Sequence, residues 1–359
     1  MANTIHFSEA HKKSLIEGFQ KQSETESLFS HELDVEFSGV RTVHVKNLKT
    51  EPLQDYNRSK SVDTGSRYGT TVEVGDEEQT FTMTKDRSLS LSIDKGNNVE
   101  QFNMKQAGKV MKAERDEVIV PEIDTYRLAK WAKDAGIHKA LAAKTTSENI
   151  VSQIVELKNE VLDAGVPDKL SLLIKREFIP ALKLSKEWIA LDSLGGKTLP
   201  KGVIGEFDGM PVKPVTNSRF PKNAVFMILY KGSVISPMKI NTFKGHVDPP
   251  GLNGDLLEFR MMYDAFVLGK RAAGVAVGCL SGTVAAAPTA SYGSGKVTLA
   301  SADGGTIYYT TDGSDPRYSV EAKAYTGAFA ADAGIVVRAY VAKEGSWNSS
   351  VLDYTVTAG

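Results

Sequence analysis

Residues 202–212 read GVIGEFDGMPV and open the stretch that decides the fold of this chain. The pair Asp208-Gly209 between two apolar runs predicts a tight β-hairpin, because glycine supplies the positive φ angle that such a turn needs. The apolar run 224–230, AVFMILY, predicts a buried strand. A Gly/Pro-rich interruption then precedes a returning strand that leads into 263–268, YDAFVL. This order of elements carries no catalytic chemistry.

Helices mixed with strands are expected upstream of this stretch. Residues 145–148, TTSE, offer a capping box for a helix that Gly165 and Pro167 end. The apolar stripe of that helix is Ile150, Ile154, Leu157 and Val161. A buried strand at 170–174 and a helix near 178–184 follow, which together predict an α/β or α+β domain.

A long helix is predicted from about 98 to 117, with a second helix after Pro121. The first has apolar side chains at heptad-compatible spacing, namely Met104, Ala107, Met111 and Val118. The second is marked by Leu128, Trp131, Ala132 and Ala135.

The N-terminal part predicts an arm and a hairpin. Residues 8–22 have apolar side chains at helical spacing, which indicates either a short amphipathic helix on a mobile arm or a frayed N-terminus. Segments 80–84 and 89–93 alternate with period two around 85–87, which predicts a long hairpin. Because this hairpin has too little apolar surface for a core, we expect it to lie on its own domain or on a neighbouring subunit.

The composition changes at Leu280. From Ser281 onward Gly, Ala, Ser and Thr dominate, and short strands such as 297–299 and 335–340 are separated by Asp/Gly turns. A separate small β-sandwich over 281–359 is expected.

Size and composition exclude several function classes. The chain has 359 residues, 41% hydrophobic and 24% charged, with a net charge of -1, so it has no global attraction for nucleic acid or anionic lipid. Cys279 is the only cysteine, which rules out an intrachain disulfide and suggests a reducing compartment. The opening residues lack the apolar core of a signal peptide, and no segment approaches the roughly 20 apolar residues of a membrane span. We therefore expect a protein that is cytosolic when made.

No catalytic, cofactor-binding or metal-binding residue is expected. The phosphate-loop-like run 195–198, GGKT, has Leu191 where the full motif needs a glycine, so a surface turn is the preferred interpretation. Acidic groups such as Asp255 and Glu258 are expected to be solvated. Cys279 lies at a domain boundary, a poor place to orient a nucleophile. None of the histidines has metal-ligand spacing: His6, His11, His31, His44, His138 and His246.

The order of elements over residues 1–279 resembles the HK97-like fold of tailed-bacteriophage major capsid proteins. The resemblance rests on FTMTKDR at 81–87, SID at 92–94, VPEID at 120–124 and the hairpin with its downstream strands. It implies an α+β chain with these parts: an N-arm at 1–40, an extended loop at 41–95, a spine helix at about 98–117, and peripheral and axial domains to 279.

The C-terminal part resembles the immunoglobulin-like module found on chitobiases and many bacterial surface proteins. The residues that carry this likeness are GTIYYTTDGSDP at 305–316 and GIVVRAYVAKEGSWNSS at 334–350. Such modules are accessory domains, so the likeness implies a fold more than an activity. Tyr308, Tyr318 and Trp347 are candidate glycan-contacting aromatics, although aromatic side chains in a small sandwich are usually packed.

The resemblance implies a non-enzymatic structural protein that assembles into an icosahedral shell around phage double-stranded DNA, with residues 281–359 on its exterior. Its partners would be further copies in hexameric and pentameric capsomers, a portal and a scaffolding function, and packaged DNA bound without sequence specificity. A glycan or cell-surface contact through the C-terminal module is also expected. The protein would be made and assembled in the host cytoplasm and reside in the virion capsid.

Within the extended loop, Lys85, Asp86 and Arg87 are expected to contact neighbouring subunits. Some family members cross-link an extended-loop lysine, and Lys60 and Lys85 lie in that region, but no motif identifies an asparagine partner, so no cross-link is predicted. The alternative function is a secreted carbohydrate-binding or carbohydrate-active surface protein. A third is an intracellular enzyme with a degenerate phosphate loop.

Overall fold

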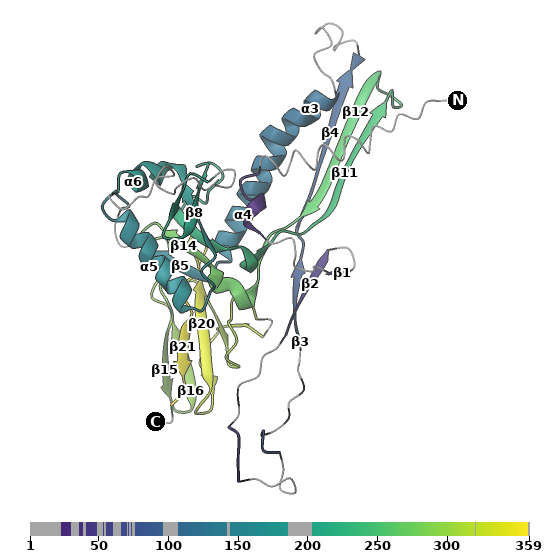
Figure 1. Ribbon diagram of the computed structural model, residues 1–359. Coiled ribbons are helices and arrows are strands. Elements are labelled where there is room, and N and C mark those ends of the chain that lie inside the picture. The colour runs from purple at the N-terminus through teal and green to yellow at the C-terminus, as the bar shows by residue number, and fades with distance from the viewer. Residues whose placement is uncertain are drawn as a thin grey trace.

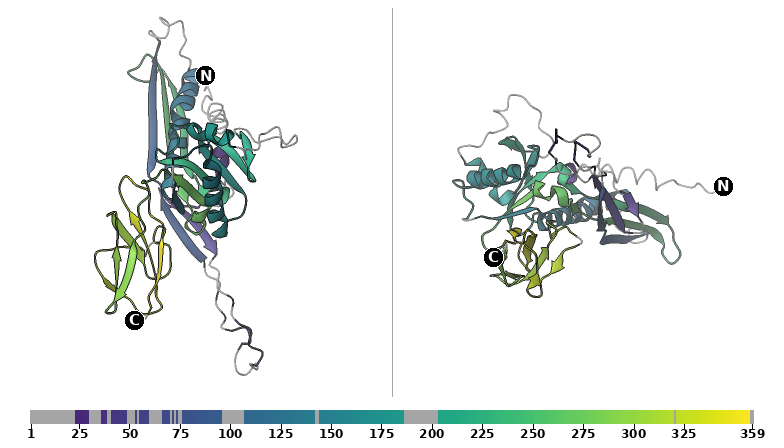
Figure 2. Two further views of the ribbon diagram at one scale, coloured as in Figure 1. Left: turned by 90° about the vertical axis from the view of Figure 1, so that its left-hand side faces the viewer. Right: turned by 90° about the horizontal axis from the view of Figure 1, so that it is seen from below.

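The computed structural model describes residues 23–29, 36–38, 41–48, 53, 55–59, 66–69, 71, 73, 76–95, 107–141, 144–185, 203–319 and 321–357. Figure 1 shows an elongated molecule with a central body of helices and strands. A long sheet with its helix extends from one end of the body, and a hairpin of two strands, 42–48 and 76–82, extends in the opposite direction. The C-terminal strands form a separate layer beside the root of this hairpin (Figures 1 and 2).

Six strands form the central sheet of the body in the order β5-β14-β9-β6-β8-β7. Strand β9 runs antiparallel to both of its neighbours, whereas the pairs β5/β14 and β6/β8 are parallel. The run 224–230 forms β9, and its first six residues are buried, as a strand packed on both faces requires. The bounds are Ile137–Ala140 (β5), Leu170–Lys175 (β6), Gly205–Phe207 (β7), Met210–Val215 (β8), Ala224–Tyr230 (β9) and Val275–Cys279 (β14).

Helices cover both faces of this sheet. On one face, α5 (Ile150–Asp163) and α6 (Ile179–Lys183) pack on β9 residues that include Phe226 and Ile228. On the other face, α4 (Val120–Lys133) contributes Leu128 and Trp131 to a core with Met227 and Val277. This mixed sheet with its helices, together with the antiparallel sheets described below, confirms the expected α+β class.

Helix α5 confirms its predicted apolar stripe but not its predicted cap. Ile150, Ile154, Leu157 and Val161 are all buried. The helix begins after Asn149, whose side chain accepts a hydrogen bond from the Thr146 amide, so the expected capping box at 145–148 does not form. A capping side chain must stand directly before the first helical turn. That position is held by Asn149 and not by Thr145. Gly165 follows the helix at a φ of 79°, as predicted.

The Asp208-Gly209 turn has the predicted geometry. Asp208 has a φ of 48° and Gly209 a φ of 74°, the two positive angles of a type I′ turn. The buried Lys158 of α5 donates to the Asp208 carbonyl at 2.7 Å and to its carboxylate at 2.9 Å. The hairpin is thereby tied to the helix that covers the sheet.

The two helices predicted around Pro121 are one continuous helical run. It consists of α3 (Ala107–Glu114), a π-helical turn (Arg115–Ile119) and α4. The expected end of the spine helix at about 117 is therefore wrong, because the backbone stays helical through Ile119 and Pro121 follows directly after the wider π-helical turn without ending the run. Its expected start near 98 lies outside the described residues.

The π-helical turn also moves the buried face by one residue. Val118, predicted to be apolar and inward, is 49% exposed, whereas Ile119 is buried. A π turn holds one residue more than an α turn, so the position seven residues after Met111 rotates outward and the eighth rotates inward.

A three-stranded peripheral sheet in the order β11-β12-β4 lies beside α3. Its apolar face includes Ile93, Leu257 and Phe259, which share a core with Met111 and Ile123 of the helical run. The bounds are Lys85–Asp94 (β4), Met238–Val247 (β11) and Gly254–Tyr263 (β12). The turn between β11 and β12 is the Gly/Pro-rich interruption at 248–253.

The extended hairpin is built differently from the prediction. Residues 80–84 and 89–93 do not pair with each other, because β3 (Asp76–Thr82) pairs with β2 (Thr42–Leu48), whereas β4 pairs with β12. Strand β1 (Glu36–Ser38) completes the sheet of β2 and β3. At the root, Val43, Val45 and Met83 pack in a small core with Phe266 and Leu268. Strands β10 (Val234–Ile235) and β13 (Phe266–Val267) form a short ladder there.

The C-terminal β-sandwich, residues 285–356, has its own core. A three-stranded sheet β15-β16-β19 faces a four-stranded sheet β18-β17-β20-β21. Val297, Leu299, Val337, Ala339 and Val341 are buried between them, which confirms an all-β immunoglobulin-like region. The bounds are Thr289–Gly293 (β15), Lys296–Ala300 (β16), Thr306–Thr310 (β17), Lys323–Ala324 (β18), Phe329–Ala330 (β19), Val336–Ala342 (β20) and Leu352–Thr355 (β21).

Short 3₁₀ helices connect these elements in the described part of the chain. Their bounds are Glu26–Leu28 (η1), Arg176–Phe178 (η4), Lys231–Ser233 (η6) and Gly269–Gly274 (η7). In the described part of the chain, no helix has both the length and the apolar character to cross a membrane.

Candidate functional site

An N-terminal anchor segment, residues 23–29, binds to the body around a buried carboxylate. Asp124 of α4 has no exposed surface. It accepts hydrogen bonds from Ser23 Oγ at 2.5 Å, the Glu24 amide at 2.9 Å and Thr25 Oγ1 at 2.6 Å. Arg219 Nη1 lies 3.0 Å from the same carboxylate and neutralises it. A buried carboxylate with this many donors fixes the path of the anchor segment.

Arg127 supplies the matching positive charge one turn later. Its guanidinium is 2% exposed and donates to Glu26 Oε2 at 2.8 Å, Thr25 Oγ1 at 3.1 Å and Ser236 Oγ at 2.8 Å. It also lies over the Phe29 ring, 4.6 Å from its centroid. Leu28 and Phe29 enter the core around Trp131, so the anchor segment closes one side of the body.

Sequence reasoning missed this cluster, although a signal was present. Asp124 and Arg127 occupy the same helical face as Leu128 and Trp131, at spacings of three, four and seven residues. Charged residues within an apolar stripe are buried only when they are paired. Their position therefore indicates a partner from outside the helix.

The hairpin tip, as far as it is described (53, 55–59 and 66–69), carries an exposed aromatic pair. Tyr56 and Tyr68 meet edge to face with ring centroids 5.0 Å apart. Tyr68 is 80% exposed and Leu53 is fully exposed, while Asn57 and Arg67 close the turn through a backbone hydrogen bond of 2.9 Å. Large apolar side chains at the tip of a protruding hairpin form a surface suited to a partner.

The residues expected to contact other subunits, Lys85, Asp86 and Arg87, begin β4 and have partners within the chain. Arg260 donates to both oxygens of Asp86, at 3.0 and 2.8 Å, and lowers the pKa of that carboxyl. Arg87 pairs with Glu122 at 2.7 Å, which raises the pKa of the guanidinium. Lys85 Nζ lies 5.0 Å from the Tyr126 ring centroid. Their role between subunits stays a prediction.

Asp264 ties the start of β4 to the helical run. Its carboxylate is buried and accepts from the Thr84 amide at 2.7 Å and from the Tyr126 hydroxyl at 2.7 Å. Burial, more than the neighbouring charge, raises the pKa of Tyr126 to about 12, so this hydroxyl remains a donor. Tyr126 and Tyr263 line a hollow of about 510 Å³ beside α4.

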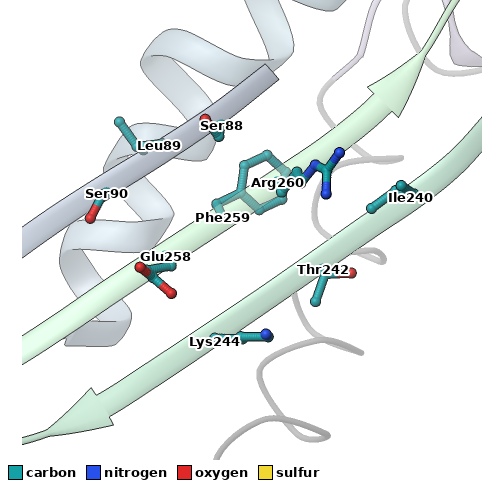
Figure 3. A pocket seen from close by; sticks show the side chains of 9 residues that line it. All are labelled: Ser88, Leu89, Ser90, Ile240, Thr242, Lys244, Glu258, Phe259 and Arg260. Carbon is teal, nitrogen blue, oxygen red and sulfur yellow. The ribbon is translucent and has the colours of Figure 1, made fainter. Parts of the chain in front are cut away.

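The peripheral sheet leaves its second face open. Alternation along β12 places Glu258 and Arg260 on the side opposite Phe259. A shallow hollow of about 370 Å³ lies at this sheet, and Figure 3 shows the side chains that line it. Its lining residues are Ser88, Leu89, Ser90, Ile240, Thr242, Lys244, Glu258, Phe259 and Arg260. A sheet with one apolar face on a helix and one polar open face is suited to a surface contact.

The C-terminal β-sandwich binds to the body through backbone carbonyls. Tyr318 donates its hydroxyl to the Asp134 carbonyl at 2.7 Å, and Arg317 Nη1 donates to the Gly136 carbonyl at 2.5 Å. Asp315 holds the guanidinium at 2.7 Å. Burial raises the pKa of Tyr318, so its hydroxyl keeps its proton for this bond.

An aromatic stack completes this contact. The Trp347 ring lies on His138 of β5 with centroids 5.5 Å apart and 18° between the planes. Trp347 Nε1 donates to the Asn223 carbonyl at 3.4 Å. Tyr318 and Trp347 both pack against the core that contains Trp131, so the sandwich and the body share packed surface.

The three candidate glycan-contacting aromatics have different packing partners. Tyr318 and Trp347 face the body, whereas Tyr308 of β17 stacks on Tyr340 of β20 with centroids 5.6 Å apart. The structure instead brings together Tyr309, Tyr325 and Phe329, with 4.2 Å between the centroids of Tyr309 and Phe329. Glycan contact by Tyr308 stays a prediction.

Two observations bear on chemistry in the described part of the chain. No cluster of three His, Cys, Asp or Glu side chains suited to a metal occurs among the described residues. Cys279 is buried, and burial raises the pKa of its thiol, which disfavours the thiolate. The phosphate-loop-like run 195–198 and Lys60 lie outside the described residues.

Comparison with solved structures identifies the fold of the larger part. A structure from Microbacterium phage Oxtober96 matches with a TM-score of 0.52 and 12% identity, covering 72% of this chain and 91% of that one. The mature capsid of bacteriophage PhiM1 matches with a TM-score of 0.50 and 12% identity, covering 71% and 91%. The capsid of cyanophage P-SCSP1u matches with a TM-score of 0.50 and 10% identity, covering 68% and 85%.

Sequence comparison identifies the C-terminal part. Residues 287–353 match the family model of the chitobiase/beta-hexosaminidase C-terminal domain. No curated protein matches the chain. The chain therefore has the HK97-like fold of phage capsid proteins, followed by an immunoglobulin-like region of the chitobiase C-terminal type.

Proposed function

We propose that this chain is a structural capsid protein, many copies of which assemble into an icosahedral shell that encloses phage double-stranded DNA. The observation that carries the proposal is the shared fold with the PhiM1 and P-SCSP1u capsids over about 70% of the chain. In this proposal the chain is not an enzyme. It acts through contacts with further copies of itself in hexameric and pentameric capsomers.

The exposed parts of the chain support assembly. The hairpin tip with Leu53, Tyr56 and Tyr68 and the open face of the peripheral sheet both lie away from the body's own cores. Several different surface patches allow the heterologous, ring-closing contacts that a shell requires. Lys85, Asp86 and Arg87 lie between these two surfaces along the chain, so they are candidates for such contacts.

We further propose that residues 1–279 form the shell and that residues 281–359 are displayed on its exterior. The separate core of the C-terminal β-sandwich supports this division. The shell would be built in the host bacterial cytoplasm, with a portal and a scaffolding function. It would hold its DNA without sequence specificity, which agrees with the net charge of -1.

Electron microscopy of the purified full-length protein tests the proposal. We expect shells or capsomers, either from the chain alone or after co-expression with its scaffold or protease. On intact particles, a C-terminal tag should be accessible to antibody. A persistent monomer under all of these conditions would contradict capsid assembly, and a tag that is protected until particles are opened would contradict exterior display.

The second candidate function is carbohydrate binding by a surface protein, favoured by the match of residues 287–353 to a chitobiase/beta-hexosaminidase domain. Tyr308 and Tyr340 offer an aromatic stack on the sandwich. A glycan array probed with the full chain tests this function. Glycan binding that Tyr308→Ala abolishes, combined with an absence of particles, would favour this candidate over the capsid. Glycan binding by assembled shells would instead assign a ligand to the displayed sandwich.

A further inference from the structure

The contact between the body and the C-terminal β-sandwich contains an imidazole with one unused nitrogen. His138 is 8% exposed. Its Nε2 lies 2.7 Å from the Ala132 carbonyl, and because a carbonyl only accepts, this nitrogen carries the proton. Nδ1 has no hydrogen-bond partner among the described residues. The site therefore fits a neutral imidazole stacked on Trp347 and offers nothing to a second proton.

The charged group that acts on the protonation of His138 is itself positive. Arg317 of the sandwich donates to the Gly136 carbonyl, two residues before His138, and opposes a second positive charge there. Asp315 already holds this guanidinium through two hydrogen bonds, at 3.0 and 2.7 Å. Other titratable groups lie on the elements packed around β5. On the sandwich these are Tyr318 and Tyr340. At the end of α4, Lys130 pairs with Asp134 at 3.1 Å. Lys139 of β5 pairs with Glu156 at 3.3 Å and with Glu160 at 3.7 Å, and β14 carries the Cys279 thiol.

We propose that His138 is a pH-sensitive latch: as a neutral ring it holds the C-terminal β-sandwich against the body, and its protonation releases the sandwich. The release exposes the ring and gives Nδ1–H water as an acceptor. Trp347 and Arg317 move away with the sandwich, which removes both the stacking partner and the repelling charge. The proposal concerns the single chain and does not depend on capsid assembly.

The pH window follows from the burial of the ring. Burial lowers the pKa of His138 from 6.5 to about 4 in the docked chain. The released chain, with a pKa near the ordinary value, binds the proton more readily. Docking is therefore at full strength above pH 6.5, weakens as the pH falls from 6.5 towards 4, and changes no further below that.

Release of the sandwich reaches the extended hairpin. Gly269 of η7 donates its amide to Gln79 Oε1 of β3 at 3.2 Å. A Cβ at Gly269 would lie 2.8 Å from the Tyr318 Cβ, so the sandwich also touches this point. The hairpin root, η7 and the sandwich thus meet at one glycine. Release of the sandwich would remove Tyr318 from this contact beside the root.

Hydrogen exchange of backbone amides in the full-length protein tests the latch. Labelling at pH 7.0 and pH 4.5, corrected for intrinsic exchange rates, should show a loss of protection on the order of 50-fold at pH 4.5. The loss is expected in peptides from the contact, which cover residues 134–140, 312–319 and 345–349. Peptides from α5 serve as the internal reference and should keep their protection.

Variants separate the latch from other acid effects. His138→Phe keeps a stacked ring without a titrating group, and His138→Gln keeps a neutral polar one, so both should remain docked at pH 4.5. His246→Gln removes an exposed imidazole that pairs with Glu258 and should respond as the parent chain does. Equal acid release in the parent and in a folded His138→Phe or His138→Gln variant would overturn the proposal, as would full protection of the parent contact at pH 4.5.

Discussion

The N-terminal anchor segment and the C-terminal β-sandwich attach to the same part of the body by different means. The anchor segment binds to buried side-chain charges of α4, Asp124 and Arg127. The sandwich donates mainly to backbone carbonyls, those of Asp134, Gly136 and Asn223. The first attachment is encoded in side chains on both sides. The second is encoded mainly in the incoming sandwich, since every residue carries a carbonyl.

The largest effect is expected where the charges are buried. Asp124→Ala leaves Arg219, Thr25 and the Glu24 amide without their shared acceptor, and breaking a buried charged cluster costs about 3–5 kcal/mol. We expect the free energy of unfolding, measured with urea, to fall by that amount. Glu156→Gln is the control, because its side chain is 62% exposed and should change stability by less than about 0.5 kcal/mol. Equal losses in the two variants would show that the Asp124 cluster contributes no more than an exposed carboxylate.

Trp347→Ala should have the next largest effect. The half-buried ring loses its stack on His138 and its packing on the body core, which together are worth about 2–3 kcal/mol. Hydrogen exchange should show lost protection at residues 134–140 already at pH 7. Tyr325→Ala, which removes an aromatic ring that packs within the sandwich, should spare those residues. A Trp347→Ala variant with unchanged protection at 134–140 would show that the stack does not hold the sandwich.

Arg317→Lys should cost less, about 1–2 kcal/mol. A lysine keeps the charge but cannot bind the Gly136 carbonyl and both Asp315 oxygens in one plane. Arg338→Lys is the matched control, because Arg338 forms a similar fork to Asp353 and donates to the Gly313 carbonyl of the sandwich itself, not to the body. That change should cost about 0.5 kcal/mol or less in urea unfolding. If Arg338→Lys were the more damaging change, the contact of Arg317 with the Gly136 carbonyl would contribute little to stability.

The smallest effect on stability is expected at the hairpin tip. Tyr68→Ser removes a ring that is 80% exposed and should change the free energy of unfolding by less than about 0.5 kcal/mol. If the proposed function holds, the same change should reduce the yield of particles in sedimentation. Val336→Ser, at an exposed apolar position of the sandwich, should leave that yield unchanged. Normal particle yield from Tyr68→Ser would exclude its ring from the assembly contacts.

The central body could be predicted from the sequence because its signals are local. The run 224–230 is long and apolar enough to specify a strand buried on both faces, and Asp208-Gly209 specifies its own turn. The stripe from Ile150 to Val161 specifies one helical face. Each of these depends on neighbours in the chain rather than on a distant partner.

Pairing between distant strands could not be predicted in the same way. The alternation of apolar and polar residues correctly placed strands near 80–84 and 89–93. Alternation shows which face of a strand is apolar, but it does not show which other strand pairs with it. The partner of β4 is β12, more than 150 residues later in the chain. The assumption that successive strands pair gave the wrong hairpin.

The two attachments also differ in how far the sequence could predict them. Asp124 and Arg127 carried a readable signal, two charges in an apolar stripe, although their partners could not be named from it. The carbonyls of Asp134 and Gly136 carried none, and the roles of Tyr318 and Trp347 became visible only with the body beside them. Aromatic side chains alone could not distinguish packing from ligand binding.

The π-helical turn at 115–119 has a consequence for how this chain tolerates changes in length. A one-residue insertion in a helix rotates everything beyond it by about 100°, which normally separates an apolar face from its core. Here the extra residue is already absorbed: Met111 before the turn and Ile123 after it both face the peripheral core, and Leu128 faces the central one. The turn keeps the peripheral core continuous across the extra residue, and it marks the place in the helical run where a change in length by one residue is most readily accommodated.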